Sequence, residues 1–80
     1  DLDKAARHFS RTISLEPGYA DAHFNLGIVH QERGRLEEAL RCYDEAARLD
    51  STLADAAAAA DFVRRALKDD AKRKGANKEP

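Results

Sequence analysis

Apolar residues recur at helical spacing in two neighbouring segments, on either side of Gly34. Three- and four-residue steps return to the same face of a helix, so the pattern predicts helices over 20–33 and 36–49. Gly34 is a natural end for the first, because glycine adopts a left-handed conformation without a Cβ clash. The stretch therefore predicts a helical hairpin, whose aligned positions are Ala22, Leu26, Val29, Arg33, Leu36, Ala39, Leu40, Tyr43, Ala46, Ala47 and Leu49, with His23 and His30 beside them.

The same pattern occurs again before and after the hairpin, at a constant offset of 34 residues. Upstream, Ala5 and Phe9 match Ala39 and Tyr43, and downstream Ala54-Asp55-Ala56 repeats Ala20-Asp21-Ala22. A shared offset over several positions indicates an internal repeat of one structural unit. It predicts two more helices, one over 1–15 and one from Ala54 to about Asp70.

The repeated unit resembles a tetratricopeptide repeat (TPR), whose pattern of large, small and aromatic positions has this period. The matching residues are His23-x2-Leu26-Gly27-x2-His30, then Ala39-x3-Tyr43, then Ala46, with Ser51 where the family has proline. Histidines replace two of the usual aromatic residues. The resemblance implies an all-α fold of antiparallel helical hairpins stacked as a short solenoid, in which Gly27 lets the second helix come close.

The repeat alignment divides the chain into one helical domain and a tail. Residues 1–16 are expected to be the second helix of a partial repeat, 20–53 a complete repeat, and 54–70 a capping helix in which Asp61 takes the glycine position. Residues 71–80 are expected to form a disordered basic tail, which together with Arg64 and Arg65 loosely resembles a nuclear-import signal. By the same alignment we expect the chain to be a fragment of a longer protein.

Composition narrows the classes of function. The net charge is −1, so the chain lacks the concentrated basic surface of a nucleic-acid binder. No apolar run approaches the roughly 20 residues of a membrane span. The single cysteine, Cys42, cannot form an internal disulfide. We expect a soluble, cytoplasmic protein that binds neither nucleic acid nor membrane.

The candidate chemical groups do not form a catalytic or metal site. His23 and His30 are seven residues apart, so their Cα atoms lie about 10 Å apart on a helix, too far for one zinc ion to bridge easily. They are interpreted as polar substitutes for packed aromatics. Cys42 is expected at a largely outward position without a histidine partner. The sequence therefore predicts no enzyme activity, no metal and no cofactor.

Binding of another protein is the leading hypothesis, because the predicted first helix of the repeat carries residues opposite its core stripe. The resemblance places this face in a concave groove that takes a peptide or a partner helix. Phe24 and Ile28 are the apolar members, although they could instead pack against a neighbouring unit of the same chain. The full predicted site comprises Asp21, Phe24, Asn25, Ile28, Gln31 and Glu32, with Asp55, Ala58, Phe62 and Arg65 from the next helix.

The resemblance also raises the questions of whether the ligand is a terminal carboxylate and whether the chain has a structural role instead. Some family members clamp a terminal carboxylate with asparagine and basic residues; Asn25 fits, but Asp55 and Ala59 stand where lysine and arginine would be required. Carboxylate recognition is therefore disfavoured. The alternative to peptide binding is a structural role, as the end of a longer array or as a homo-oligomer contact, with a catalytic domain elsewhere in the protein.

Overall fold

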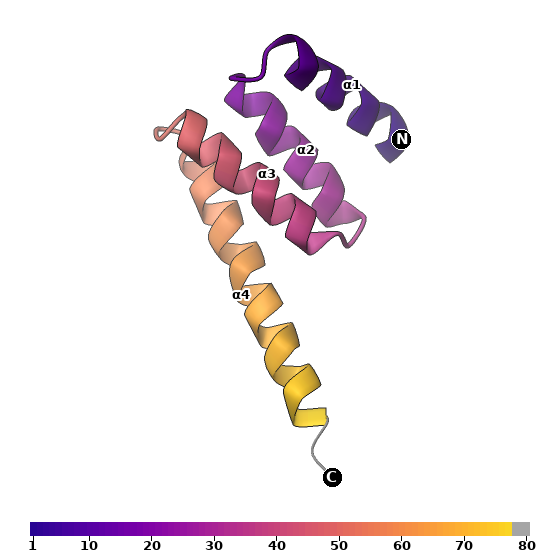
Figure 1. Ribbon diagram of the computed structural model, residues 1–80, viewed down its shortest axis with the longest axis vertical. Helices are drawn as coiled ribbons and strands as arrows, with labels where there is room; N and C mark the ends of the chain where they lie inside the picture. Colours follow the sequence, from indigo (N-terminus) through magenta and orange to yellow (C-terminus); the bar gives the residue numbers. More distant parts are fainter. Residues whose placement is uncertain (78–80) are drawn as a thin grey trace.

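The computed structural model describes the backbone of residues 1–77 and the surroundings of side chains 1–72. It contains four helices, α1 (Leu2–Leu15), α2 (Ala20–Glu32), α3 (Leu36–Leu49) and α4 (Ala54–Asn77), and no strand within the described residues. Consecutive helices run in opposite directions and lie side by side (Figure 1). The prediction of an all-α fold built from antiparallel hairpins is confirmed.

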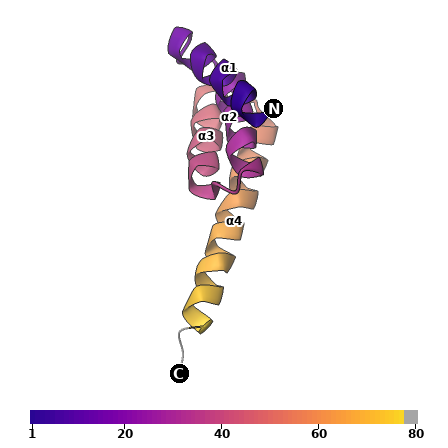
Figure 2. The ribbon, with the colours of Figure 1, turned by 90° about the vertical axis from the view of Figure 1, so that its right-hand side faces the viewer.

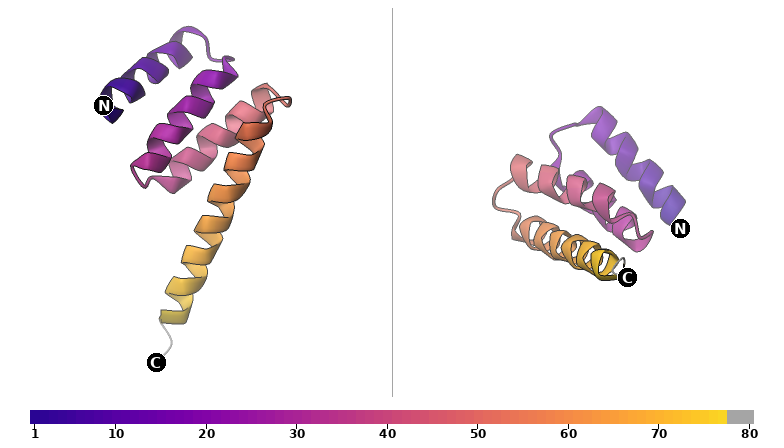
Figure 3. Two further views of the ribbon diagram at one scale, coloured as in Figure 1. Left: turned by 180° about the vertical axis from the view of Figure 1, so that it is seen from behind. Right: turned by 60° about the horizontal axis from the view of Figure 1, so that its bottom comes forward.

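The helices stack in chain order. α2 packs between α1 and α3, and α4 packs on the far side of α3. Seen from the side, α1, α2 and α3 form a thin layer with α4 leading away from it (Figure 2), and the views from behind and from below show the same order (Figure 3). A layer of this kind leaves two broad faces exposed to solvent.

Local hydrogen bonds fix where the helices begin and end. The carboxylate of Asp1 accepts from the Asp3 backbone N–H at 2.9 Å, which caps α1. Gly34 has φ +77°, so the left-handed turn predicted between α2 and α3 is present. After α3, the Asp50 carboxylate accepts from both the backbone N–H and the hydroxyl of Thr52, at 3.0 and 2.6 Å. This turn reverses the direction of the chain, so that α4 runs antiparallel to α3.

Gly27 and Tyr43 set the distance between α2 and α3. A Cβ placed on Gly27 would lie 2.6 Å from Tyr43 Cε1 and 3.2 Å from Cys42 Cβ, closer than carbon atoms pack. The Tyr43 ring is 1% exposed and therefore cannot move aside into solvent. The sequence-based expectation that Gly27 permits a close approach of the two helices is confirmed.

The core lies where α3 meets its two neighbours. Its buried cluster is formed by Ala39, Tyr43, Ala60 and Val63, with larger partly buried side chains packed around it. Alanine contributes little apolar area, so Tyr43 and Val63 are the largest fully buried side chains. This small core packs α2, α3 and the first half of α4 against one another.

α4 is longer than the sequence analysis predicted. The expected end near Asp70 is wrong, because the helix continues to Asn77 and turns most of the predicted disordered tail into helix; residues 78–80 lie outside the described part. Leu67 is the last α4 residue packed against the core cluster, and 68–72 are exposed. Alanine and basic residues favour helix and suit its C-terminal end, and Pro80 is the first helix-breaking proline downstream.

Candidate functional site

One row of residues repeats on α2 and α4 and defines a common face. On α2 the row is Asp21, Asn25, Ile28 and Glu32, at steps of four, three and four residues. Such steps keep side chains along one side of a helix. The equivalent row on α4, 34 residues later, is Asp55, Ala59, Phe62 and Ala66. We call these two rows the concave face, after the groove that the sequence analysis expects there. Ala66 was not in the predicted site, although its offset from Glu32 could have identified it.

Phe24 and Ile28 do not stand out from this face as free anchors. Both are partly buried and pack against the core cluster, and the Phe24 ring lies 5.6 Å from the Tyr43 ring between centroids. The alternative left open by the sequence, that they pack within the same chain, is therefore what the structure shows. Much of the surface of Phe24 and Ile28 is therefore used within the chain.

Gln31 is engaged with the core. The hydroxyl of Tyr43 donates to Gln31 Oε1 at 2.6 Å, and this contact is partly buried. Burial raises the pKa of the Tyr43 hydroxyl, and the nearby Cys42 and Glu32 raise it further, so the hydroxyl stays protonated and donates. Gln31 therefore positions the Tyr43 ring, with its carbonyl oxygen already used inside the protein.

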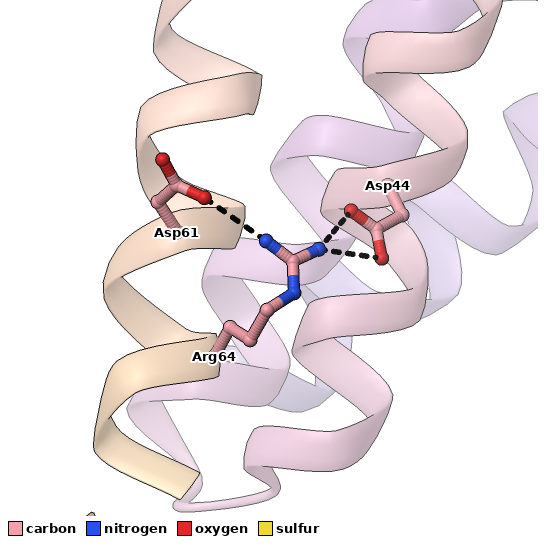
Figure 4. A network of polar contacts seen from close by, with 3 residues as sticks. All are labelled: Asp44, Asp61 and Arg64. Atoms are coloured by element: carbon pink, nitrogen blue, oxygen red, sulfur yellow. Dashed lines mark hydrogen bonds and ion pairs between the residues drawn. The ribbon is translucent and has the colours of Figure 1, made fainter. Parts of the chain in front are cut away.

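Phe62 is the exposed apolar residue of the concave face. Its side chain is 64% exposed, while Asp55 and Arg65 are also exposed. Arg64, two residues further, donates to Asp61 on its own helix and to Asp44 on α3 (Figure 4). Residues two apart on a helix point about 200° apart. Phe62 therefore points to the side of α4 opposite Asp44.

The charges on this face are mostly negative. Asp21, Glu32 and Asp55 form no ion pair within the described part of the chain. Asp21 and Asp55 also lie in the first turns of their helices, where negative charge is favourable. Arg65 is the cation of the predicted site. The concave face thus combines an apolar centre with carboxylates near its ends.

The histidines fill space within the stack. His23 Nε2 lies 2.9 Å from the Pro17 carbonyl oxygen, which ties α2 to the preceding turn. His30 Nδ1 is buried without a hydrogen-bond partner among the described residues. Within those residues, no group of three or more histidine, cysteine or acidic side chains is arranged to hold a metal ion.

Cys42 lies on a different side of α3 from the one expected. The sequence analysis placed it largely outward, whereas its Cβ lies 3.2 Å from where a Gly27 Cβ would be, so it faces α2. Burial raises the pKa of the thiol, with a smaller opposing effect of Arg41. A thiol with a raised pKa is a poor nucleophile near neutral pH.

Comparison with known families agrees with this geometry. The family model described as "Tetratricopeptide repeat" matches residues 20–53, which comprise α2, α3 and the turn that follows. Residues 20–53 are a tetratricopeptide repeat. The TPR carries both the close contact at Gly27 and one row of the concave face.

A relative of this chain is an uncharacterized protein of Methanocaldococcus jannaschii. It is 42% identical over 43 residues, which cover 54% of this chain and 50% of the relative. This chain thus matches half the length of that curated relative. Among the described residues, no helix is both long and apolar enough to cross a bilayer.

Proposed function

We propose that the chain is a non-catalytic protein-interaction module whose concave face binds an extended peptide or one helix of a partner protein. TPR units generally bind proteins, and the specific support is Phe62, a large apolar residue that is 64% exposed at the position equivalent to the partly buried Ile28. Large aromatic side chains at the centre of an interface commonly supply much of its binding energy.

The charges of the concave face favour a particular ligand. Asp21, Glu32 and Asp55 favour basic side chains, while Phe62 favours an apolar one. Asn25 is partly buried and adds an amide that can bond a peptide backbone. A terminal carboxylate would meet Asp55, so the ligand proposed is a segment with basic residues flanking an apolar one.

A peptide library selected against the full chain tests this proposal. Peptides with basic and apolar residues should be enriched, and Phe62→Ala should weaken their binding at least about tenfold. Tyr19→Ala is the matched control, because Tyr19 is 47% exposed in the turn before α2, outside the concave face. Equal binding by wild type and Phe62→Ala, or a larger loss in Tyr19→Ala, would contradict the proposal.

A structural role for α4 is the second candidate, favoured by one observation. Asp61 occupies the position equivalent to Gly27, and it pairs with Arg64. A second helix could not approach α4 there as α3 approaches α2, because it would meet a charged side chain rather than a bare backbone. We propose that α4 closes the stack on this side. Replacing Asp61 with glycine should then increase self-association in sedimentation experiments, and an unchanged monomer would argue against the closing role.

A further inference from the structure

Four exposed residues form one stripe along the first half of α4. They are Asp55, Ala58, Phe62 and Arg65, at steps of three, four and three residues. These steps keep side chains on one side of a helix, and they are also the spacing of the positions through which two helices pair in a coiled coil. We call this surface the α4 stripe. It shares Asp55 and Phe62 with the concave face.

The α4 stripe differs at two positions from its counterpart on α2, which lies 34 residues earlier. The small Ala58 takes the place of Phe24, and the cationic Arg65 takes the place of Gln31. Phe24 and Gln31 are used inside the chain, Phe24 by the core cluster and Gln31 by the Tyr43 hydroxyl. Ala58 and Arg65 are exposed. The α4 stripe therefore presents to solvent a surface that α2 uses for internal packing.

α4 also does not turn back where α2 does. α2 is followed by the left-handed Gly34, after which α3 packs along it. The equivalent position of α4 is Lys68, and the helix runs through it to Asn77 (Figure 1). Asp61 stands at the position of the glycine that admits α3 to α2. The repeat pattern therefore does not predict a further helix packed on α4 as α3 is packed on α2.

The two ends of the α4 stripe carry opposite charges. Asp55 and Arg65 form no ion pair within the described part of the chain. They are about 15 Å apart along the helix at 1.5 Å per residue, too far to pair with one another. In two antiparallel α4 helices that cross level with Ala60, however, Asp55 of each copy lies opposite Arg65 of the other. The same crossing sets the small Ala58 of each copy opposite the large Phe62 of the other.

We propose that the α4 stripe binds the α4 stripe of a second copy of the chain, with the two helices antiparallel. A two-fold axis level with Ala60 makes each contact occur twice, as in the self-complementary interfaces of symmetric dimers. Two large-to-small contacts then form the centre, and an ion pair lies at each end. A parallel pair would set Asp55 against Asp55 and Arg65 against Arg65, and like charges that face one another disfavour it.

The dimer should be weak and should compete with peptide binding. One pair of short helical segments covers less area than a standard protein interface, so association is expected only at high micromolar or millimolar concentrations. Its ion pairs are exposed, so added salt should weaken it. Because the α4 stripe and the concave face share Phe62, a peptide bound there should dissociate the dimer.

Sedimentation equilibrium of the full chain at low salt and at several concentrations tests the proposal. Arg65→Asp sets a carboxylate against Asp55 in both ion pairs. It should raise the dimer dissociation constant about tenfold, as expected when two exposed pairs change from attractive to repulsive. Arg41→Asp is the matched control: Arg41 is exposed on α3, so it changes the net charge equally but away from the α4 stripe. It should leave the dissociation constant nearly unchanged.

Restoring the charge pairs separates direct pairing from damage to the fold. Asp55→Arg alone should weaken the dimer, and an equal mixture of Asp55→Arg and Arg65→Asp chains should associate at least as well as wild type, because every facing charge is then opposite. The double variant with both substitutions should also dimerise like wild type. A strictly monomeric wild type at millimolar concentration, equal losses in Arg65→Asp and Arg41→Asp, or no recovery in both the mixture and the double variant would overturn the proposal. None of these outcomes would contradict peptide binding by the concave face, which is measured separately.

Discussion

Gly27 and Tyr43 show how one missing side chain positions two helices. Alanine at a helical position favours the helix by about 1 kcal/mol relative to glycine, so propensity alone would favour Gly27→Ala. The new Cβ would, however, lie 2.6 Å from a Tyr43 ring carbon. The ring is held by Phe24 and by its bond to Gln31, and it is 1% exposed. The steric cost should therefore exceed the gain in propensity.

Gly27→Ala is predicted to lower the free energy of unfolding by about 1–3 kcal/mol, as overpacking of a filled core does. Chemical denaturation followed by circular dichroism measures it. Gly18→Ala is the matched control, because a Cβ there meets nothing within 4 Å. An equal effect of the two substitutions would show that the contact between α2 and α3 is not limiting.

The roles of residues that depend on one helical hairpin could be predicted from the sequence. The exposure of residues that contact a neighbouring repeat could not. Gly27, Gly34 and Tyr43 follow from the repeat pattern and local backbone chemistry. Phe24 and Ile28 could be exposed or covered, depending on what α4 presents. α4 presents alanines and Val63, which leave room that larger side chains of α2 help to fill. Cys42 was misplaced because flanking charges suggested an outward position, although it lies one residue before the buried Tyr43.

At the scale of the helices, the turn after α3 depends on an ionised carboxylate. The pKa of Asp50 is lowered chiefly by hydrogen bonds from the Thr52 hydroxyl and backbone N–H. Its contribution to stability is therefore present above the unfolded-state pKa, about 3.9, and is lost as the pH falls through the lower folded-state pKa. The difference in melting temperature between wild type and Asp50→Ala should shrink as the pH falls below about 4.

The Thr52→Ala variant tests the cause of the lowered pKa. In this variant the Asp50 pKa measured by NMR should rise, because both the hydroxyl and its hydrogen bond are lost. An unchanged pKa would show that the Thr52 hydroxyl is not the cause.

The ion pair that joins Arg64 of α4 to Asp44 of α3 is expected to contribute little to stability. Arg64 lies 3.0 Å from Asp44 and 2.9 Å from Asp61, but its side chain is 46% exposed. Exposed ion pairs contribute about 0–1 kcal/mol and are screened by salt. A double-mutant cycle with Arg64→Ala and Asp44→Ala should give a coupling within that range, which decreases at high salt. A larger, salt-independent coupling would mean that this contact holds α4 more firmly than the core does.

The C-terminal end of α4 could not be predicted from hydrophobic periodicity. Periodicity identifies α4 while it has a core stripe to follow, and the stripe stops at Leu67. Beyond Leu67 the helix depends on the helix propensity of its residues and on basic charges near its C-terminal end. Neither produces a periodic pattern of apolar residues. The predicted boundary therefore followed the loss of the stripe, whereas the helix itself continues to Asn77.

At the scale of the molecule, the stack has three distinct surfaces. The concave face carries Phe62, α1 carries the partly buried Phe9 among exposed basic residues such as Lys4 and Arg11, and the ion pairs of Arg64 lie where α4 meets α3. The order of helices and the common face of α2 and α4 could be predicted, because a 34-residue period places equivalent residues on one side of a stack. The exposure of each apolar residue could not, because it depends on packing between units.

The central claim is that partners bind along the rows of α2 and α4. The most direct measurement is an NMR map of amide shifts when a peptide selected on the full chain is added. We predict that the largest shifts fall on Asp21, Asn25 and Ile28 of α2 and on Asp55 and Phe62 of α4, and that they vanish in Phe62→Ala. Shifts concentrated instead on exposed positions of α3, such as Arg41 and Arg48, would contradict the account.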